Sequence, residues 1–174
     1  MNIILIGFMG TGKSTVGRLL ADQLGCEFID TDNRLAELEG QSIPEIFAVH
    51  GEQYFRSLEA ALAKSLAVKD RQIIATGGGF PLNPQNLTEV RTNGVIILLK
   101  AAPQLIFQRV QSDKNRPLLQ VEDPLLKIES LLAVREAFYT DADITVDTND
   151  KEVKEVVGEI VSELERRGYF HGES

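Results

Sequence analysis

The chain has 174 residues, 43% of them hydrophobic and 25% charged, a balance typical of a globular protein and not of a disordered or fibrous one. Its net charge of −8 argues against a broad nucleic-acid-binding face, and no apolar run approaches the roughly 20 residues that cross a bilayer. A single cysteine, Cys26, cannot form an internal disulfide, which fits a reducing compartment, so we expect a cytoplasmic protein. We also expect that it binds neither nucleic acid nor membrane and that it is a monomer.

Apolar, β-rich runs alternate with helical patterns along the chain, which is the pattern of a parallel sheet covered by helices on both faces. The predicted strands are 2–6, 27–29, 72–75, 95–99 and 144–146. The predicted helices are 13–24, 32–39, 42–67, 82–90, 103–110, 123–139 and 151–167. We expect one domain over residues 1–168 and a frayed tail over 169–174. The polar, poorly periodic segment 111–123 is predicted to be a lid or a mobile loop.

The segment GFMGTGKS, from Gly7 to Ser14, matches G-x-x-x-x-G-K-[ST] and lies between a predicted buried strand and an amphipathic helix. Its glycines let backbone N–H groups surround a phosphate, and the helix N-terminus adds partial positive charge. Lys13 would bridge the β- and γ-phosphates, and the Ser14 hydroxyl would bind Mg²⁺. A glycine-rich turn that binds nothing is a much less favoured alternative. The loop predicts nucleotide binding but not the reaction, because many enzyme classes share it.

Two further motifs follow the next strands. The second strand ends in Asp30-Thr31-Asp32, where one carboxylate could hold Mg²⁺ while the other accepts or orients a hydroxyl proton. The alternative for Asp32 is a simple helix N-cap. The third strand ends in Thr76-Gly77-Gly78-Gly79 without a metal-binding aspartate, which suggests that Asp30 has that role. The three glycines either expose N–H groups to a small polar ligand or form a sharp turn required by packing.

Several arginines are candidates for binding anions. Arg56 and Glu59 lie three residues apart on a predicted helix, so Glu59 can hold a guanidinium whose planar fork suits a carboxylate. An ordinary surface ion pair is the alternative. Arg116 lies in the predicted lid, where it could neutralise the transferring γ-phosphate. Arg109 and Arg135 lie on the flanking predicted helices. Taken alone, each of these three is more typical of a solvated helix face.

These motifs, in this order, resemble those of shikimate kinases. The matching segments are GFMGTGKST, FIDTD, IPEIFAVHGEQYFRSLE, ATGGG, RPLL, REAFY and ITVDT, which extend from residue 3 to about residue 148. The phosphate loop is generic, whereas the other motifs at these spacings are specific. The resemblance implies transfer of the γ-phosphoryl group of ATP to the 3-hydroxyl of shikimate in aromatic amino-acid biosynthesis. It also implies an α/β fold of the P-loop, nucleoside monophosphate kinase-like type, with a five-stranded parallel sheet of order 2-3-1-4-5 and a mobile lid.

The resemblance also implies site residues. For ATP they are Gly10, Thr11, Gly12, Lys13, Ser14, Thr15, Arg109 beside the adenine and Arg116 of the lid. For shikimate, bound by a region of about 31–60 and its neighbours, they are Asp32, Phe47, Phe55, Arg56, Glu59, Gly78, Gly79 and Arg135. Mg²⁺ would be held by Ser14 and Asp30, and the catalytic set is Lys13, Asp32 and Arg116. On pattern alone, the two phenylalanines fit an apolar helical stripe, which is compatible with a role only in the core.

Where many relatives place a basic residue near the adenine, this chain has Asn149-Asp150-Lys151, so we expect weaker or rearranged contacts to the base. Two other functions remain open on the residues alone. One is another small-molecule kinase of this fold, such as a gluconate-type or nucleotide kinase. The other is a nucleotide sensor without activity, against which the presence of Lys13, Asp32 and Arg116 argues.

Overall fold

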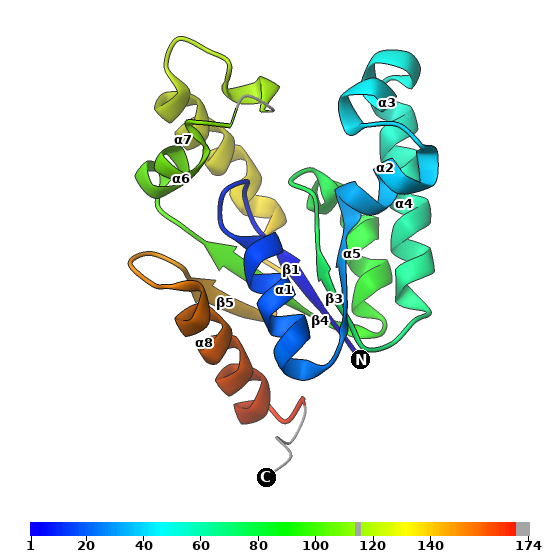
Figure 1. The fold of residues 1–174 in the computed structure, drawn as a ribbon, viewed down its shortest axis with the longest axis vertical. Helices are drawn as coiled ribbons and strands as arrows, with labels where there is room; N and C mark the ends of the chain where they lie inside the picture. The colour runs from blue at the N-terminus through cyan, green and yellow to red at the C-terminus, as the bar shows by residue number, and fades with distance from the viewer. Residues whose placement is uncertain (114–115, 170–174) are drawn as a thin grey trace.

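A computed structural model describes residues 1–113 and 116–169 and contains a five-stranded parallel sheet covered by helices on both faces (Figure 1). The strands are β1 (Asn2–Ile6), β2 (Glu27–Asp30), β3 (Gln72–Ala75), β4 (Gly94–Lys100) and β5 (Ile144–Asp147). Their order in the sheet is β2-β3-β1-β4-β5, as predicted. Because all the pairings are parallel, the carboxyl ends of the strands meet at one edge, where ligands bind in sheets of this type.

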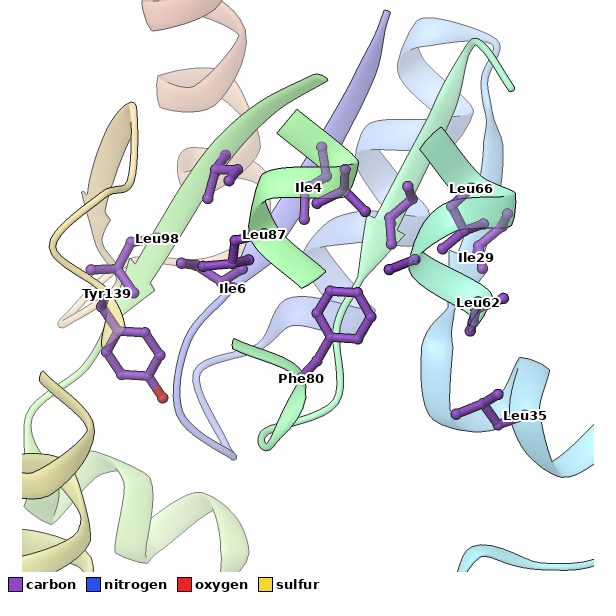
Figure 2. Packing of buried hydrophobic residues seen from close by; sticks show 14 of the residues in the cluster. Ile4, Ile6, Ile29, Leu35, Leu62, Leu66, Phe80, Leu87, Leu98 and Tyr139 are labelled. Carbon is purple, nitrogen blue, oxygen red and sulfur yellow. The ribbon is translucent and has the colours of Figure 1, made fainter. Parts of the chain in front are cut away.

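The central strand β1 is buried on both faces, which explains its uninterrupted apolar sequence. Ile4 and Ile6 pack in one core cluster with side chains of α4 (Glu52–Ala67) and α5 (Pro84–Arg91), a packing seen closely in Figure 2. The intervening Ile3 and Leu5 belong to a second cluster formed with α1 (Lys13–Leu24) and α8 (Val153–Arg166). The alternation of side chains along β1 therefore joins the two halves of the core.

Two helical arms lie on either side of the carboxyl edge of the sheet (Figure 1). One arm consists of α2 (Thr31–Glu39) and α3 (Ile43–His50). The other consists of α6 (Pro103–Val110) and α7 (Pro124–Arg135) and has its own small core, which includes Phe8 from the loop after β1. Short 3-10 turns complete the structure: η1 (Phe80–Leu82), η2 (Pro117–Leu119) and η3 (Glu136–Phe138). The phosphate-loop segment therefore lies between the two arms.

The single helix predicted over 42–67 is wrong, because the chain forms α3 and α4 with a break at Gly51. Gly51 has φ 85° and ψ 173°, a conformation that only glycine adopts readily, so the helix cannot continue through it. A capping box between Ser42 and Glu45 starts α3. This break turns α3 away from α4 and creates the arm beside the site.

Three other predicted bounds are corrected. The helix predicted over 82–90 begins only at Pro84, because the Asn83 side chain caps it. The helix predicted over 123–139 ends at Arg135 and continues as η3, and the last helix begins at Val153 rather than at residue 151. Most of the predicted lid is described and contains η2, whereas residues 114–115 of the lid and 170–174 of the predicted tail lie outside the described residues. Over the described parts of the chain, every helix is too short or too polar to cross a membrane.

Candidate active site

The loop between β1 and α1 has the geometry of a phosphate-binding loop. Gly10 and Gly12 have φ values of 74° and 93°, and a Cβ on Gly10 would lie 2.8 Å from Cγ1 of Val110. Both positions therefore require glycine. The Lys13 ammonium is buried and folds back on the loop, donating hydrogen bonds to the carbonyls of Gly7 at 2.7 Å and Phe8 at 2.9 Å. Burial lowers the pKa of Lys13 to about 8, although Asp32 and Asp30 partly oppose the shift.

The side chains of Ser14 and Asp30 form a hydrogen-bonded pair at the start of α1. The Ser14 hydroxyl donates a hydrogen bond to Oδ2 of Asp30 at 2.7 Å. The other carboxylate oxygen of Asp30 accepts from the backbone N–H of Asn33 at 3.1 Å, so Asp30 is the N-cap of α2. The capping role considered for Asp32 thus belongs to Asp30. A hydroxyl and a carboxylate side by side are the hard donors that Mg²⁺ prefers.

Asp32 lies in the first turn of α2, half-buried, between the phosphate loop and the turn after β3. Burial, reinforced by the neighbouring charge of Asp30, raises the pKa of its carboxyl, while Lys13 and Arg56 oppose the rise. This carboxylate therefore interacts electrostatically with two cationic groups of the site and does not serve as a helix cap. Such a group can accept or orient a hydroxyl proton.

Each of the three glycines after β3 lies against a different charged side chain. A Cβ on Gly77 would lie 2.3 Å from Oδ1 of Asp32, and one on Gly79 would lie 2.4 Å from Nη1 of Arg56. On Gly78 the nearest atom would be Nη1 of Arg135, at 3.4 Å. The turn is therefore a backbone platform on which one carboxylate and two guanidinium groups converge. Packing of these side chains against the turn favours glycine here, as the packing alternative expected, and contact of the glycine N–H groups with a ligand stays a prediction.

The predicted partnership between Arg56 and Glu59 is confirmed. Nη1 of Arg56 donates to Oε2 of Glu59 at 2.7 Å, and Nη2 donates to the exposed Glu52 at 3.3 Å. Glu59 is only 1% exposed, so this is not the ordinary surface pair that was the alternative. Burial raises the pKa of Glu59, against the effect of Arg56. The Arg56 guanidinium is thus held in one orientation.

Arg135 is a buried cation at the end of α7. It is 9% exposed, its guanidinium lies 5.4 Å from the ring centroid of Phe8, and Nη1 has no hydrogen-bond partner among the described residues. A buried guanidinium with a free donor is a suitable site for an anion. Since the same nitrogen is the atom nearest to a Cβ on Gly78, the free donor faces the glycine turn.

Phe47 and Phe55 belong to the hydrophobic core. Phe55 is buried in the cluster with Ile4 and Ile6, and Phe47 packs against that cluster with the two ring centroids 4.7 Å apart. The Arg56 guanidinium lies 5.5 Å from the centre of the Phe55 ring. The two rings therefore form part of the core on which the Arg56 guanidinium packs.

Two arginines flank the phosphate loop from the α6–α7 side. Arg109 donates hydrogen bonds to the Gly10 carbonyl at 2.9 Å and, more weakly, to the Thr148 hydroxyl at 3.4 Å. Arg116 donates from Nε to Asp113 at 2.9 Å within the predicted lid. The two segments predicted to contact the nucleotide, near 109 and 148, are therefore adjacent.

Lys151 forms an ion pair with a residue of α8. It donates to Glu159 at 2.6 Å and to the carbonyl of Asp147 at 2.9 Å, and its pKa is raised by the Glu159 carboxylate. The cation that follows Thr148 in the sequence is thus engaged in an ion pair with α8, and weaker or rearranged contacts to the base stay a prediction.

A cavity of about 440 Å³ joins the loop, the acidic pair and the glycine turn. Its lining includes the predicted residues Gly10, Gly12, Lys13, Ser14, Thr15, Asp30, Asp32, Gly78, Arg109 and Arg116. It also includes Met9, Asn33, Thr76 and Gly77, which the sequence analysis did not single out as site residues. Of these, only Gly77 carried a signal, as the first residue of the glycine run. The remaining predicted residues lie outside the lining of this cavity: Thr11, Phe47, Phe55, Arg56, Glu59, Gly79 and Arg135.

Thr11 faces away from that cavity. It is 2% exposed, its hydroxyl donates to the Phe8 carbonyl at 2.8 Å, and it lines a separate cavity of about 370 Å³ between β4, β5 and α7. The Thr11 side chain thus stabilises the phosphate loop through this bond, on the side of the second cavity.

Comparison with known proteins agrees with this geometry. The family model described as shikimate kinase matches residues 9–165. The shikimate kinase of Caldanaerobacter subterraneus subsp. tengcongensis is 52% identical over 161 residues, which cover 92% of this chain and 94% of the relative. That of Thermodesulfovibrio yellowstonii is 45% identical over 165 residues, 95% of each chain.

Among solved structures, the shikimate kinase from Acinetobacter baumannii in complex with shikimate superposes with a TM-score of 0.90 at 37% identity, covering 97% of this chain and 95% of that one. A gluconokinase from Sinorhizobium meliloti, at 18% identity and a TM-score of 0.63, shares the fold alone. Because the family model and these relatives span nearly the whole chain, with the phosphate loop, the acidic pair and the glycine turn assembled at one edge of the sheet, the chain is an ATP-dependent kinase that belongs to the shikimate kinase family.

Proposed function

We propose that this chain transfers the γ-phosphoryl group of ATP to the 3-hydroxyl of shikimate, giving shikimate 3-phosphate and ADP on the route to the aromatic amino acids. The observation that carries the proposal is the convergence of Asp32, Arg56 and Arg135 on the glycine turn beside the phosphate loop. Two guanidinium groups and one carboxylate suit an acceptor that has both a carboxylate and hydroxyl groups.

The nucleotide would bind along residues 10–15, with its phosphates at the N-terminus of α1. Lys13 donates to the carbonyls of Gly7 and Phe8 and would exchange these partners for phosphate oxygens when ATP enters. Arg116, from the predicted lid, lines the same cavity and would neutralise charge on the transferring group. Arg109, beside Gly10 and Thr148, would flank the adenine.

Mg²⁺ would be held by Ser14 and Asp30. The 2.7 Å hydrogen bond between their oxygens brings a hydroxyl and a carboxylate together at the phosphate loop, and this donor set fits the ion. When bound with ATP, Mg²⁺ supplies positive charge to the phosphates. The backbone N–H of Asn33 donates to the other oxygen of Asp30 and so holds the carboxylate in place beside Ser14.

Shikimate would place its carboxylate between Arg56 and Arg135, with Gly78 and Gly79 allowing close approach of its ring. Glu59 holds Arg56 in place, and Phe55 packs beneath the guanidinium. Asp32 would then accept a hydrogen bond from the 3-hydroxyl and align it with the γ-phosphate. Because phosphoryl transfer has a loose transition state, we expect alignment and charge neutralisation to matter more than full proton removal. Closure of the segment 111–123 would exclude water, which otherwise competes as the acceptor.

The test is ADP release from MgATP with shikimate, with quinate and gluconate as control acceptors. Turnover with shikimate and not with the other two supports the proposal. Turnover with gluconate instead would assign a sugar-acid kinase, and nucleotide binding without turnover on any acceptor would favour a sensor. The Asp32→Asn variant, assayed in parallel, should lose turnover while it retains affinity for ATP, and normal turnover in this variant would remove Asp32 from the mechanism.

A further inference from the structure

The three residues of the Asp-Thr-Asp motif point in three directions. Asp30 bonds to Ser14, and Asp32 lines the active-site cavity. Thr31, between them, is fully buried, and its Oγ1 accepts a hydrogen bond of 2.8 Å from the backbone N–H of Gly77. None of the roles proposed above involves this hydroxyl.

The hydrogen bond from Gly77 to Thr31 takes the place of a backbone hydrogen bond between β2 and β3. Asp30, the last residue of β2, pairs with Ala75, and the next N–H on the β3 side, that of Thr76, donates to the carbonyl of Leu5 in β1. Alternate N–H groups of a strand face opposite neighbours, so the N–H of Gly77 faces the β2 side. There the chain has already entered α2, and the Thr31 hydroxyl takes the place of the strand carbonyl. Gly77 is buried, so without this acceptor its N–H would have little access to water.

The same glycine supports the Asp32 carboxylate. A Cβ on Gly77 would lie 2.3 Å from Oδ1, 2.8 Å from Cγ and 2.9 Å from Oδ2 of Asp32, so the whole carboxylate lies against the Gly77 Cα. Thr31 and Asp32 are consecutive in the first turn of α2. The hydrogen bond therefore joins the turn that carries the carboxylate to the surface on which the carboxylate lies.

We propose that Thr31 is a positioning residue for Asp32: its hydrogen bond to the Gly77 N–H sets the spacing between α2 and the glycine turn, and so the approach of the carboxylate to the acceptor hydroxyl. The inference rests on the proposed role of Asp32. It implies that loss of the hydroxyl impairs phosphoryl transfer more than ATP binding, because Lys13 and the phosphate loop belong to a different helix.

Three substitutions separate the hydroxyl from the volume of the side chain. Thr31→Val keeps the volume and removes the acceptor, Thr31→Ser keeps the acceptor, and Thr31→Cys supplies a weak one. We expect kcat to fall about tenfold in Thr31→Val, less in Thr31→Cys and little in Thr31→Ser, with the Kd of ATP unchanged in all three. If Thr31→Val does not fold, the comparison of serine with cysteine decides, and equal kcat values for these two would overturn the proposal.

Asn2→Leu is the matched control for a purely structural effect. The Asn2 side chain also accepts a buried N–H of β3, that of Gln72 at 3.0 Å, but at the opposite end of the strand. Asn2 additionally donates to the carbonyls of Leu66 and Lys69. We therefore expect its unfolding midpoint to fall at least as far as that of Thr31→Val, with kcat unchanged. A lower midpoint with normal kcat in Thr31→Val would make Thr31 merely structural.

Asp32→Asn distinguishes the two possible failures. If that variant turns over normally, the proposed role of Asp32 is wrong. If it loses turnover while Thr31→Val keeps it, only the inference about Thr31 is wrong. Where Asp32→Asn leaves measurable turnover, adding Thr31→Val should reduce kcat little further, because both changes act on the same group, and a fully additive loss would contradict the proposal.

Discussion

The guanidinium of Arg56 lies directly against the Cα of Gly79, so that a Cβ at this glycine would fall 2.4 Å from Nη1 and 2.9 Å from Cζ. Arg56 comes from α4 and Gly79 from the turn after β3, two segments that meet only in the folded chain. The contact with Gly79 sets how closely the Arg56 guanidinium approaches the glycine turn. Under the proposed function, this position would determine where the shikimate carboxylate meets Arg56.

Gly79→Ala should displace that guanidinium and raise the KM for shikimate about tenfold, since one charged hydrogen bond is lost or misaligned. The variant should still fold, because Gly79 has φ −90° and ψ −10°, which alanine adopts without strain, and the arginine tip can move. Steady-state kinetics with each substrate varied in turn provide the measurement. An unchanged KM for shikimate would show that Arg56 binds its ligand from another position.

Gly158→Ala is the control for the previous substitution. Gly158 is exposed within α8, and a Cβ there would meet nothing within 4 Å. Alanine in place of glycine inside a helix should stabilise the fold by about 0.5–1 kcal/mol. Thermal or denaturant unfolding measures this gain, and neither KM should change.

Arg56→Lys should weaken shikimate about tenfold or more and leave ATP nearly unaffected. The charge remains, but the planar fork and its bonds to Glu59 and Glu52 are lost. Binding titrations with each ligand give the two affinities separately. Equal losses for both ligands would argue against a carboxylate clamp at this position.

The affinity for ATP should fall as the pH rises through about 8, the pKa of Lys13 in the free enzyme. Phosphate oxygens favour the charged ammonium, so the pKa rises in the complex, and binding takes up a proton above that pH. Calorimetric titrations from about pH 7 to about pH 9.5 should show the fall in the wild type but not in Lys13→Arg, whose guanidinium stays charged throughout. The same fall in both proteins would assign it to another group.

Asp30→Asn should raise the Mg²⁺ concentration needed for half-maximal activity several-fold without lowering the unfolding midpoint appreciably. Asparagine still caps a helix well, so its oxygen can accept the Asn33 N–H, but the negative charge beside Ser14 is gone. Activity measured against Mg²⁺ at saturating ATP tests this. An unaltered Mg²⁺ requirement would remove Asp30 from the proposed metal site.

The features that depend on spacing within one segment were predictable from the sequence. The loop that ends in Lys13 and Ser14 was recognisable because all the residues of its motif lie within one short segment of the chain. The pair Arg56–Glu59 was predictable because side chains three apart on a helix are neighbours. The strand order came from the resemblance to a family and not from the residues alone, since strand pairing joins segments far apart in the sequence.

Other features were decided by the tertiary structure. The sequence indicated that three consecutive glycines matter, but only the folded chain assigns them to Asp32, Arg135 and Arg56, which arrive from α2, α7 and α4. The folded chain likewise directs Thr11 into the second cavity and brings the Thr31 hydroxyl to the N–H of Gly77. By itself, the sequence determined the fold class and the candidate residues for nucleotide binding, because periodicity and local spacing act over a few residues. Which side chains meet across elements depends on the order of the strands and the packing of helices upon them, and that is settled only when the core closes.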